Sequence, residues 1–151
     1  MVLAATMLEP IKLAGSLCRD YGASSRLEWL ETNGTGGYAM GTVAGTNSRR
    51  YHGLLVASLR PPVERYLLLS RLDEEIFVNG HHFALGANQF PGAIDPTGFR
   101  YLEEFRLDPF PVWRYRLNGA VVEKKLFLAS NRQAVVVQHT SDTAPCLARR
   151  P

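Results

Sequence analysis

Short apolar runs separated by turn residues make up most of the chain, and this pattern is typical of β-strands. Residues 52–58 (HGLLVAS) and 66–70 (YLLLS) each predict a buried strand, and residues 133–139 (QAVVVQH) predict another. Pro61 and Pro62 lie between the first two runs and interrupt any regular ladder, because proline has no amide hydrogen to donate. Long segments with helical period are few, so the pattern predicts a chain built from strands.

Two Asn-Gly dipeptides predict β-hairpins. Asn79-Gly80 separates two short apolar runs, and Asn118-Gly119 separates residues 113–117 from residues 120–128. A two-residue hairpin turn requires positive φ at both central residues, and Asn-Gly adopts this conformation most readily. Both dipeptides therefore predict antiparallel pairing of the strands beside them.

The predicted strand at residues 113–117 (WRYRL) alternates apolar and cationic side chains, so we expect one face toward a core and one toward water. Residues 86–98 (GANQFPGAIDPTG) are rich in glycine and proline, and they predict a long loop. Many short antiparallel strands are accommodated by two packed sheets. The predicted fold class is therefore all-β, an antiparallel β-sandwich.

Composition indicates one domain, because 151 residues with 46% hydrophobic content are enough for a single core. The formal net charge is +3 and the arginines are spread along the whole chain, so we expect no nucleic-acid partner. Cys18 and Cys146 lie far apart with no CxxC pair, which predicts neither a disulfide framework nor a zinc site. This cysteine usage favours the reducing cytoplasm. No apolar run approaches the length that crosses a bilayer, so we expect no membrane partner.

Residues 32–53 (TNGTGGYAMGTVAGTNSRRYHG) formally contain the dinucleotide pattern GxGxxG/A, at Gly34, Gly36 and Ala39. That pattern holds a pyrophosphate only where a helix begins on it. Gly41 and Gly45 would weaken such a helix by about 1 kcal/mol each. The nucleotide interpretation therefore fails, and we expect no cofactor. The glycines instead favour turns, bulges and close approach of backbones.

Four consecutive residues, Arg49, Arg50, Tyr51 and His52, end this stretch. On a strand, Arg50 and His52 would share one face while Arg49 and Tyr51 share the other. One interpretation makes them solvated charges at an amphipathic edge, and the other makes them a ligand-facing surface. The residues alone leave both interpretations open.

The run at residues 28–58 (EWLETNGTGGYAMGTVAGTNSRRYHGLLVAS) closely resembles the opening of the N-terminal domain of the bacterial and archaeal type of glycogen debranching enzyme, the amylo-α-1,6-glucosidase family. Residues 67–74 (LLLSRLDE) and 103–115 (EEFRLDPFPVWRY) extend this resemblance. It implies a β-sandwich accessory domain that precedes a helical α/α toroid carrying the glycosidase site. It also implies two partners, the helical catalytic domain and an α-glucan such as glycogen or maltodextrin.

Glycosidic hydrolysis generally needs two carboxyl groups that flank the scissile bond. Residues 73–75 (DEE) and Glu103-Glu104 are neighbours in sequence, and neighbours on a strand point apart, so neither cluster makes a converging pair. We expect both clusters to be surface charge or turn caps. The resemblance places the catalytic acids in the helical domain, so we assign no catalytic residue to this chain, and no metal site.

The resemblance makes several residues candidates for a sugar-facing or domain-facing surface. Arginine and histidine can donate hydrogen bonds to hydroxyls, while tyrosine and tryptophan offer a flat apolar face to a pyranose ring. The candidates are Arg49, Arg50, Tyr51, His52, Asn33 and Trp29.

The resemblance also divides the chain into segments. We expect residues 1–26 to be a partly ordered extension, residues 27–139 to be the sandwich domain, and residues 140–151 to be a divergent or truncated tail. The family's domain continues for several more strands, so the resemblance implies an incomplete sandwich with an unpaired edge.

Two other functions stay open. A stand-alone carbohydrate-binding module would hold glucans through exposed aromatic residues such as Trp29, Tyr38 or Trp113, although a tryptophan in a sandwich is more often part of the core. An inert fragment would bind nothing and would lack a cooperative melt.

Overall fold

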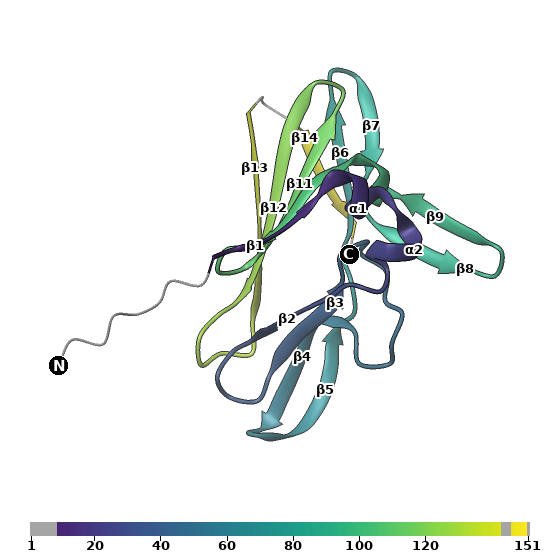
Figure 1. The fold of residues 1–151 in the computed structure, drawn as a ribbon. Helices are drawn as coiled ribbons and strands as arrows, with labels where there is room; N and C mark the ends of the chain where they lie inside the picture. Colours follow the sequence, from purple (N-terminus) through teal and green to yellow (C-terminus); the bar gives the residue numbers. More distant parts are fainter. Residues whose placement is uncertain (1–8, 143–145, 151) are drawn as a thin grey trace.

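Antiparallel strands make up most of the protein (Figure 1). The computed structural model describes residues 9–142 and 146–150, and for the last five of these it describes the backbone. The strands form several antiparallel sheets. The all-β antiparallel sandwich predicted from the sequence is confirmed.

A five-stranded sheet forms one layer, with the order β1-β10-β11-β12-β13. Its strands are β1 (Ile11–Ala14), β10 (Leu102–Leu107), β11 (Pro111–Leu117), β12 (Ala120–Leu128) and β13 (Val135–Ser141). Strand β1 pairs with β10, so a segment from the start of the described chain completes a sheet that otherwise comes from later strands.

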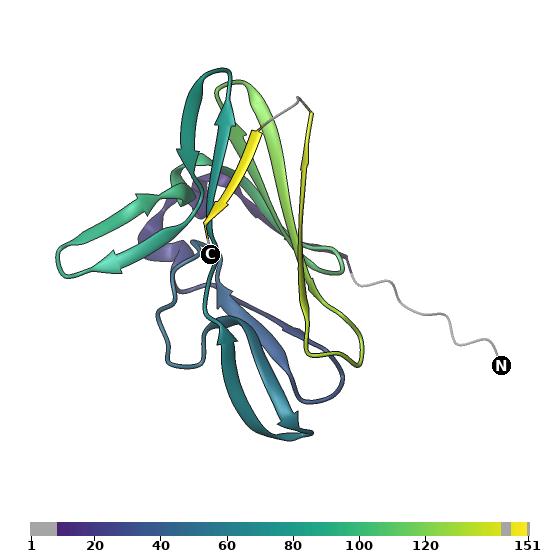
Figure 2. The same ribbon diagram turned by 180° about the vertical axis from the view of Figure 1, so that it is seen from behind.

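Two smaller sheets lie beside the five-stranded sheet (Figures 1 and 2). One has the order β2-β3-β4-β5, and the other has the order β14-β6-β7. Their strands are β2 (Glu28–Thr32), β3 (Tyr38–Thr42), β4 (Gly53–Arg60), β5 (Val63–Leu69), β6 (Asp73–Val78), β7 (His81–Ala84) and β14 (Cys146–Arg150). Strand β14 pairs antiparallel with β6, so the last described residues belong to a sheet.

Three short helices complete the described chain: α1 (Gly15–Arg19), α2 (Tyr21–Ser24) and the 3-10 helix η1 (Gly98–Tyr101). The Asp20 carboxylate caps α2 by accepting a hydrogen bond from the Ala23 amide at 3.3 Å. Cys18 of α1 is fully buried, and burial raises the pKa of its thiol. Within the segment predicted to be a partly ordered extension, residues 11–24 therefore contain a strand and two short helices.

Both Asn-Gly dipeptides form the predicted hairpin turns. Asn79 and Gly80 have φ of 49° and 76° between β6 and β7. Asn118 and Gly119 have φ of 47° and 88° between β11 and β12. Positive φ at both central residues matches the twist of the paired strands.

Residues 86–98 form a hairpin, so the long loop predicted for them was wrong. Strands β8 (Ala87–Phe90) and β9 (Ala93–Thr97) pair only with each other, and Gly92 has φ of 76° at the turn. A two-stranded hairpin leaves both outer edges unpaired. A proline can lie on such an unpaired edge, because no neighbouring strand needs the hydrogen bond that proline cannot donate. The prolines that suggested a loop are therefore compatible with the hairpin.

Strand β5 lies where the sequence predicted a strand, but the prediction that it is buried was wrong. Val63, Tyr66, Leu67 and Leu68 are 59%, 52%, 51% and 56% exposed. β5 is an edge strand that pairs with β4 alone, and these exposed side chains lie on both of its faces. Apolar composition does not distinguish an edge strand from a central one.

Two tryptophans join the layers in the core. Trp29 of β2 and Trp113 of β11 are each 4% exposed, and their rings meet edge to face with centroids 5.3 Å apart. The Trp29 indole donates to the Thr42 carbonyl at 3.2 Å, and the Trp113 indole donates to the Val43 carbonyl at 3.0 Å. Both indole N–H groups are satisfied inside the core, and they hold the end of β3 between the two sheets.

Asn33 connects the turn between β2 and β3 to the turn between β12 and β13. The residue is 2% exposed, and its Oδ1 accepts hydrogen bonds from the amides of Thr35 at 3.0 Å and Gly37 at 2.9 Å. Its Nδ2 donates to the Arg132 carbonyl at 2.9 Å and to Oε1 of Gln133 at 3.2 Å. One side chain therefore shapes its own turn and fastens it to the opposite layer.

A buried carboxylate joins the three-stranded sheet to the five-stranded sheet. Glu74 of β6 is 2% exposed, and it contacts the Lys124 ammonium and, at 2.9 Å, Nε2 of His139. Lys124 also lies over the Trp113 ring, 5.4 Å from its centroid. Burial alone would raise the pKa of Glu74, but Lys124 and His139 outweigh it and lower this pKa to about 2. The surface or capping role predicted for residues 73–75 was wrong at Glu74, because β6 turns this side chain inward.

We expect Asn33→Ala to lower the free energy of unfolding by about 3 kcal/mol, since it leaves buried amide and carbonyl groups without a partner. Urea denaturation followed by tryptophan fluorescence measures the change. Asn88→Ala is the control, because Asn88 accepts one exposed hydrogen bond from Arg71. Equal stabilities of the two variants would contradict the connecting role of Asn33.

Acid should destabilise the protein through Glu74. Its folded pKa of about 2 lies below its ordinary 4.5, so the stabilisation is present above pH 4.5 and is lost as the pH falls toward 2. The shift corresponds to about 3 kcal/mol. Unfolding free energies measured between pH 7 and pH 2.5 should fall more steeply for the natural protein than for Glu74→Gln. Parallel curves would show that the Glu74 ion pairs do not stabilise the fold.

Candidate functional site

Arg49, Arg50, Tyr51 and His52 lie in a turn that leads into β4. The His52 amide donates to the Arg49 carbonyl at 3.1 Å and closes the turn. These residues form a turn and not a strand, so the alternation that they would have on a strand does not apply. The turn buries His52 at its end and exposes Arg50 and Tyr51 in its middle.

His52 is the buried anchor of this turn. It is 2% exposed, and its Nδ1 accepts a hydrogen bond from the Ser48 amide at 3.1 Å. Because Nδ1 accepts, the proton of the neutral ring lies on Nε2, which donates to Oε1 of Glu28 at 3.1 Å. Arg49 forms an ion pair with the same Glu28 oxygen from the solvent side. Glu28 of β2 thus holds both ends of the turn.

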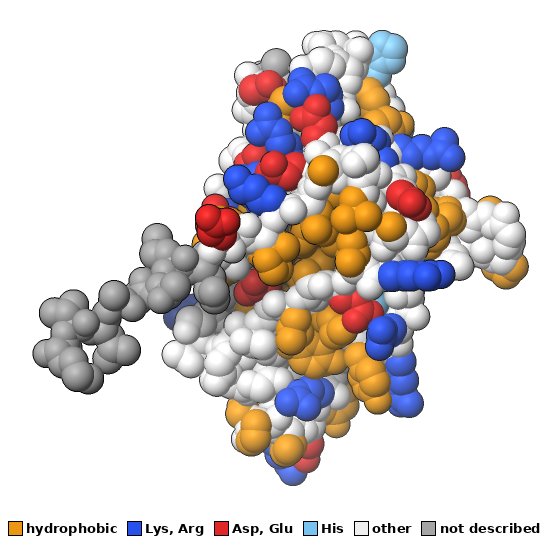
Figure 3. Space-filling model, in the orientation of Figure 1, with side chains coloured by type: hydrophobic (Ala, Val, Ile, Leu, Met, Phe, Trp, Pro, Cys, Tyr) orange, Lys and Arg blue, Asp and Glu red, His pale blue; other side chains and the backbone are white. Residues whose placement is uncertain are grey.

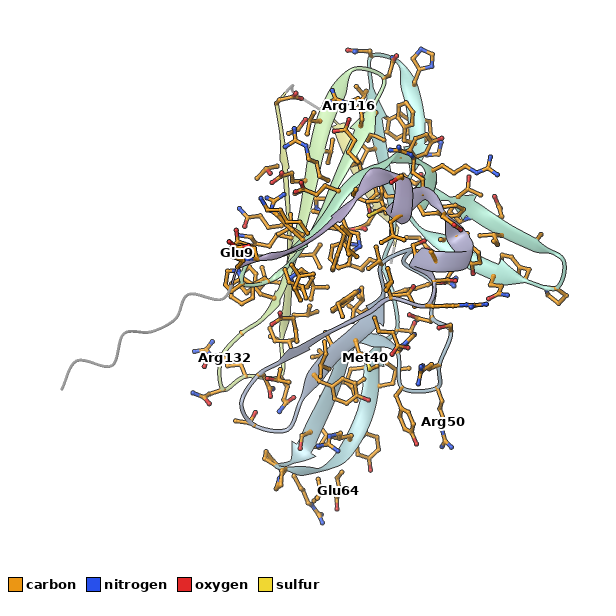
Figure 4. The ribbon with its side chains drawn as sticks, in the orientation of Figure 1. Glu9, Met40, Arg50, Glu64, Arg116 and Arg132 are labelled. Carbon is orange, nitrogen blue, oxygen red and sulfur yellow. The ribbon has the colours of Figure 1, made fainter. Side chains whose placement is uncertain are left out.

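Arg50 and Tyr51 are presented to solvent by this anchored turn. Tyr51 is 66% exposed, and Figure 4 shows Arg50 projecting away from the sheets. The Tyr38 hydroxyl donates to the Tyr51 carbonyl at 3.3 Å, which ties the turn to β3. Arg50 and Tyr51 line a surface hollow of about 390 Å³, which we call the turn hollow. Its lining residues are Tyr38, Arg50, Tyr51, Val56, Arg65 and Leu67.

A second hollow of about 500 Å³ adjoins the turn hollow, and the two share Tyr38 and Arg65. We call the two together the outer groove. The second hollow is lined by Leu30, Thr32, Gly34, Gly36, Gly37, Tyr38, Met40 and Arg65. Figure 3 shows hydrophobic and basic side chains adjoining one another over the region of β2–β5.

The glycine-rich turn shapes one wall of the outer groove. Gly36 has φ of 87°, and a Cβ at this position would lie 2.9 Å from Cα of Pro62. Glycine is therefore required both by the backbone conformation and by the close approach of the β4–β5 turn. The Gly36 carbonyl accepts a hydrogen bond from Nε of Arg65 at 2.9 Å, which holds this arginine at the groove.

The structure divides the predicted site residues into three groups. Asn33, Trp29 and His52 are buried and hold the scaffold, whereas Arg50 and Tyr51 line the outer groove. Arg49 is exposed and ion-paired with Glu28, and it lines neither hollow. Sequence reasoning missed Arg65, although the spacing of Arg65 and Leu67 on one strand places both side chains on the same face. Pairing of β5 with β4 brings that face beside the turn at residues 49–52.

The carboxylates on the outer face of the five-stranded sheet are held by arginines. Arg106 and Arg114 both contact Glu123, at 2.9 Å and 3.3 Å, and Arg114 and Arg116 contact Glu103. These hydrogen bonds and charges lower the pKa of Glu103 and of Glu123. Carboxylates in this state do not serve as proton donors near neutral pH.

Glu31 differs from these carboxylates, because burial raises its pKa. It alternates with Leu30 and Thr32 along β2, and both of those line the outer groove. Its side chain therefore leaves the opposite face of the sheet. The acid best suited by its pKa to donate a proton points away from the groove.

Among residues 9–142, no group of three or more metal-ligating side chains could hold a metal ion. In the part of the chain that the structure describes, no helix is long and apolar enough to cross a bilayer. The lining of the outer groove supplies arginine donors, tyrosine rings and apolar side chains, an arrangement suited to binding.

We expect His52→Ala to release the turn that presents Arg50 and Tyr51, because the hydrogen bonds of the imidazole ring with the Ser48 amide and the Glu28 carboxylate are lost. Trypsin cleaves after arginine, so limited proteolysis should cut after Arg49 and Arg50 at least tenfold faster in this variant. His81→Ala, a change at an exposed histidine, is the control. Equal cleavage rates would show that His52 does not hold the turn.

Comparison with protein-family models gives a match to "Glycogen debranching enzyme N terminal" over residues 27–148. Comparisons with curated proteins and with solved structures gave no match. The matched range starts just before β2 and reaches into β14, so it contains the outer groove, the tryptophan pair and the Glu74 ion pairs. The chain belongs to the family of glycogen debranching enzyme N-terminal domains.

Proposed function

We propose that this chain is the noncatalytic accessory domain of a glycogen debranching enzyme, an amylo-α-1,6-glucosidase acting on the α-1,6 branch points of glycogen or related α-glucans. In this proposal a helical domain supplies the catalytic carboxyl groups. The family match supports the debranching assignment. We also propose that the enzyme works in glycogen catabolism in the cytoplasm.

The state of the carboxyl groups is the observation that carries the noncatalytic role. Hydrolysis needs an acid of raised pKa and a second carboxylate roughly 5–10 Å away across the sugar. Glu74 is buried and ion-paired, and Glu103 and Glu123 are held by arginines. Glu31 has a raised pKa but lies on the face opposite the outer groove.

The outer groove supports an α-glucan as the ligand class. Tyrosine rings can pack against the faces of pyranose rings, and arginine donates in a plane to hydroxyl oxygens. Tyr38 is held by its hydrogen bond to the Tyr51 carbonyl, so its ring is preorganised. The groove is open along β2–β5, as a polymer requires, and its apolar floor includes Met40 and Leu67.

Release of glucose from a branched α-1,6 limit dextrin tests the proposal. We expect no release by this chain alone, and release when it is joined to the helical domain of a relative. The helical domain alone is the control, and it should be at least tenfold slower than the joined protein. Glucose released by this chain alone would overturn the noncatalytic role, and equal rates with and without it would overturn the accessory role.

A stand-alone glucan-binding module is a second candidate, and the exposure of Tyr51 favours it. Trp29 and Trp113 do not contribute to such a module in this fold, because both are 4% exposed and lie in the core. Retardation of the isolated chain in a native gel containing glycogen, together with no rate gain in the joined protein, would favour this candidate.

A further inference from the structure

We propose that the turn hollow binds a phosphate monoester carried on a hexose, with Arg50 and Arg65 holding the phosphate and Tyr51 contacting the sugar ring. If the hexose is a phosphate-bearing glucosyl unit of an α-glucan, the inference rests on the proposed function. The site for the hexose phosphate itself rests on the residues of the hollow.

The charge of the lining separates an anionic ligand from a neutral sugar. Two guanidinium groups, of Arg50 and Arg65, line the turn hollow, and no carboxylate is among its lining residues. Arginine can donate to the hydroxyl groups of a neutral sugar, but it accepts nothing from them and its positive charge stays unneutralised. Paired guanidinium groups match the oxygens of a phosphate, which accepts from both.

Arg50 and Arg65 carry no ion pair with the carboxylates that the structure describes. Within the described residues, no carboxylate lies at ion-pair distance from Arg50 or Arg65. Glu64, next to Arg65 in the chain, contacts Arg60 at 3.1 Å. Glu28 is held by Arg49 and His52.

Arg65 is positioned for this role before any ligand arrives. Its Nε donates to the Gly36 carbonyl at 2.9 Å, so the guanidinium is oriented from the groove wall. On the other side, the anchored turn at residues 49–52 positions Arg50, since His52 and Arg49 are both held by Glu28. Preorganised donors lose less conformational entropy when they bind.

The rest of the hollow suits a hexose. Its volume of about 390 Å³ is larger than a phosphate alone needs, and Val56 and Leu67 give it an apolar floor. The exposed Tyr51 ring stands at the rim and offers a flat apolar face. A phosphate bound by the arginines and a sugar ring packed against Tyr51 would fill both the cationic and the apolar part of the turn hollow.

Titration calorimetry of the 151-residue chain at low salt tests the proposal, with glucose 6-phosphate, glucose and inorganic phosphate as ligands. We expect glucose 6-phosphate to bind at least tenfold more tightly than either of the other two. Arg50→Gln should weaken its binding at least tenfold, and 0.5 M NaCl should also weaken it. Arg132→Gln is the control, because Arg132 carries the same charge, is exposed and does not line the hollow.

Tyr51→Ala separates the sugar contact from the anion contact. It should weaken binding of glucose 6-phosphate at least fivefold and leave binding of inorganic phosphate unchanged. Thermal melts of each variant show whether it is folded. Equal affinity for glucose and glucose 6-phosphate, equal affinity for inorganic phosphate and glucose 6-phosphate, or an unchanged affinity in folded Arg50→Gln would each overturn the proposal.

The source of the phosphate is distinguished by a phosphorylated maltodextrin and its phosphatase-treated form. Tighter binding of the phosphorylated maltodextrin than of glucose 6-phosphate supports a phosphate-bearing glucan, and the reverse order supports a free hexose phosphate. No binding of either phosphorylated ligand would overturn the proposal. That result is distinguishable from failure of the proposed function, because glucose release from the joined protein is measured on neutral dextrin.

Discussion

The hydrogen bonds of one buried amide, the side chain of Asn33, underlie the surface on which function is proposed. They shape the turn from residues 33–37 and fasten it to the β12–β13 turn of the opposite layer. The same turn carries the Gly36 carbonyl that orients Arg65. Gln133 adds a bond from the Ser58 amide at 3.1 Å, so β4 joins the same connection. A groove formed by separate strands is thereby held rigid from behind.

The two ends of the sandwich are joined by different chemistry. At the Asn33 end the links are neutral hydrogen bonds, and at the Glu74 end they are charges enclosed with a tryptophan ring. Buried charges lose solvation, which mutual attraction and added contacts must offset. The apolar junction of Trp29 and Trp113 adjoins the Glu74 end, because Lys124 lies over the Trp113 ring. Buried side chains therefore join the layers at both ends, and the outer groove takes no part in holding them together.

Local patterns predicted the parts of the fold that local chemistry determines. The Asn-Gly turns and the alternation from Trp113 to Leu117 are properties of a few consecutive residues, and both were confirmed. The inward direction of Glu74 and the exposure of β5 depend on which sheets pack together, so the neighbouring residues in the sequence do not predict them. The same holds for the site, because Arg50 and Arg65 meet through strand pairing across fifteen positions of sequence. The resemblance pointed to residues 28–58, and the structure separates the buried anchors of this stretch from its exposed residues.

The enclosure of the Asn33 amide bears on covalent modification. Asn33-Gly34-Thr35 matches the acceptor pattern for N-linked glycans, which are attached through the asparagine Nδ2. In the folded protein that atom donates to Arg132 and Gln133, and the residue is almost wholly inaccessible. Folding therefore protects this acceptor, and a glycan attached before folding would occupy the space in which the two layers meet.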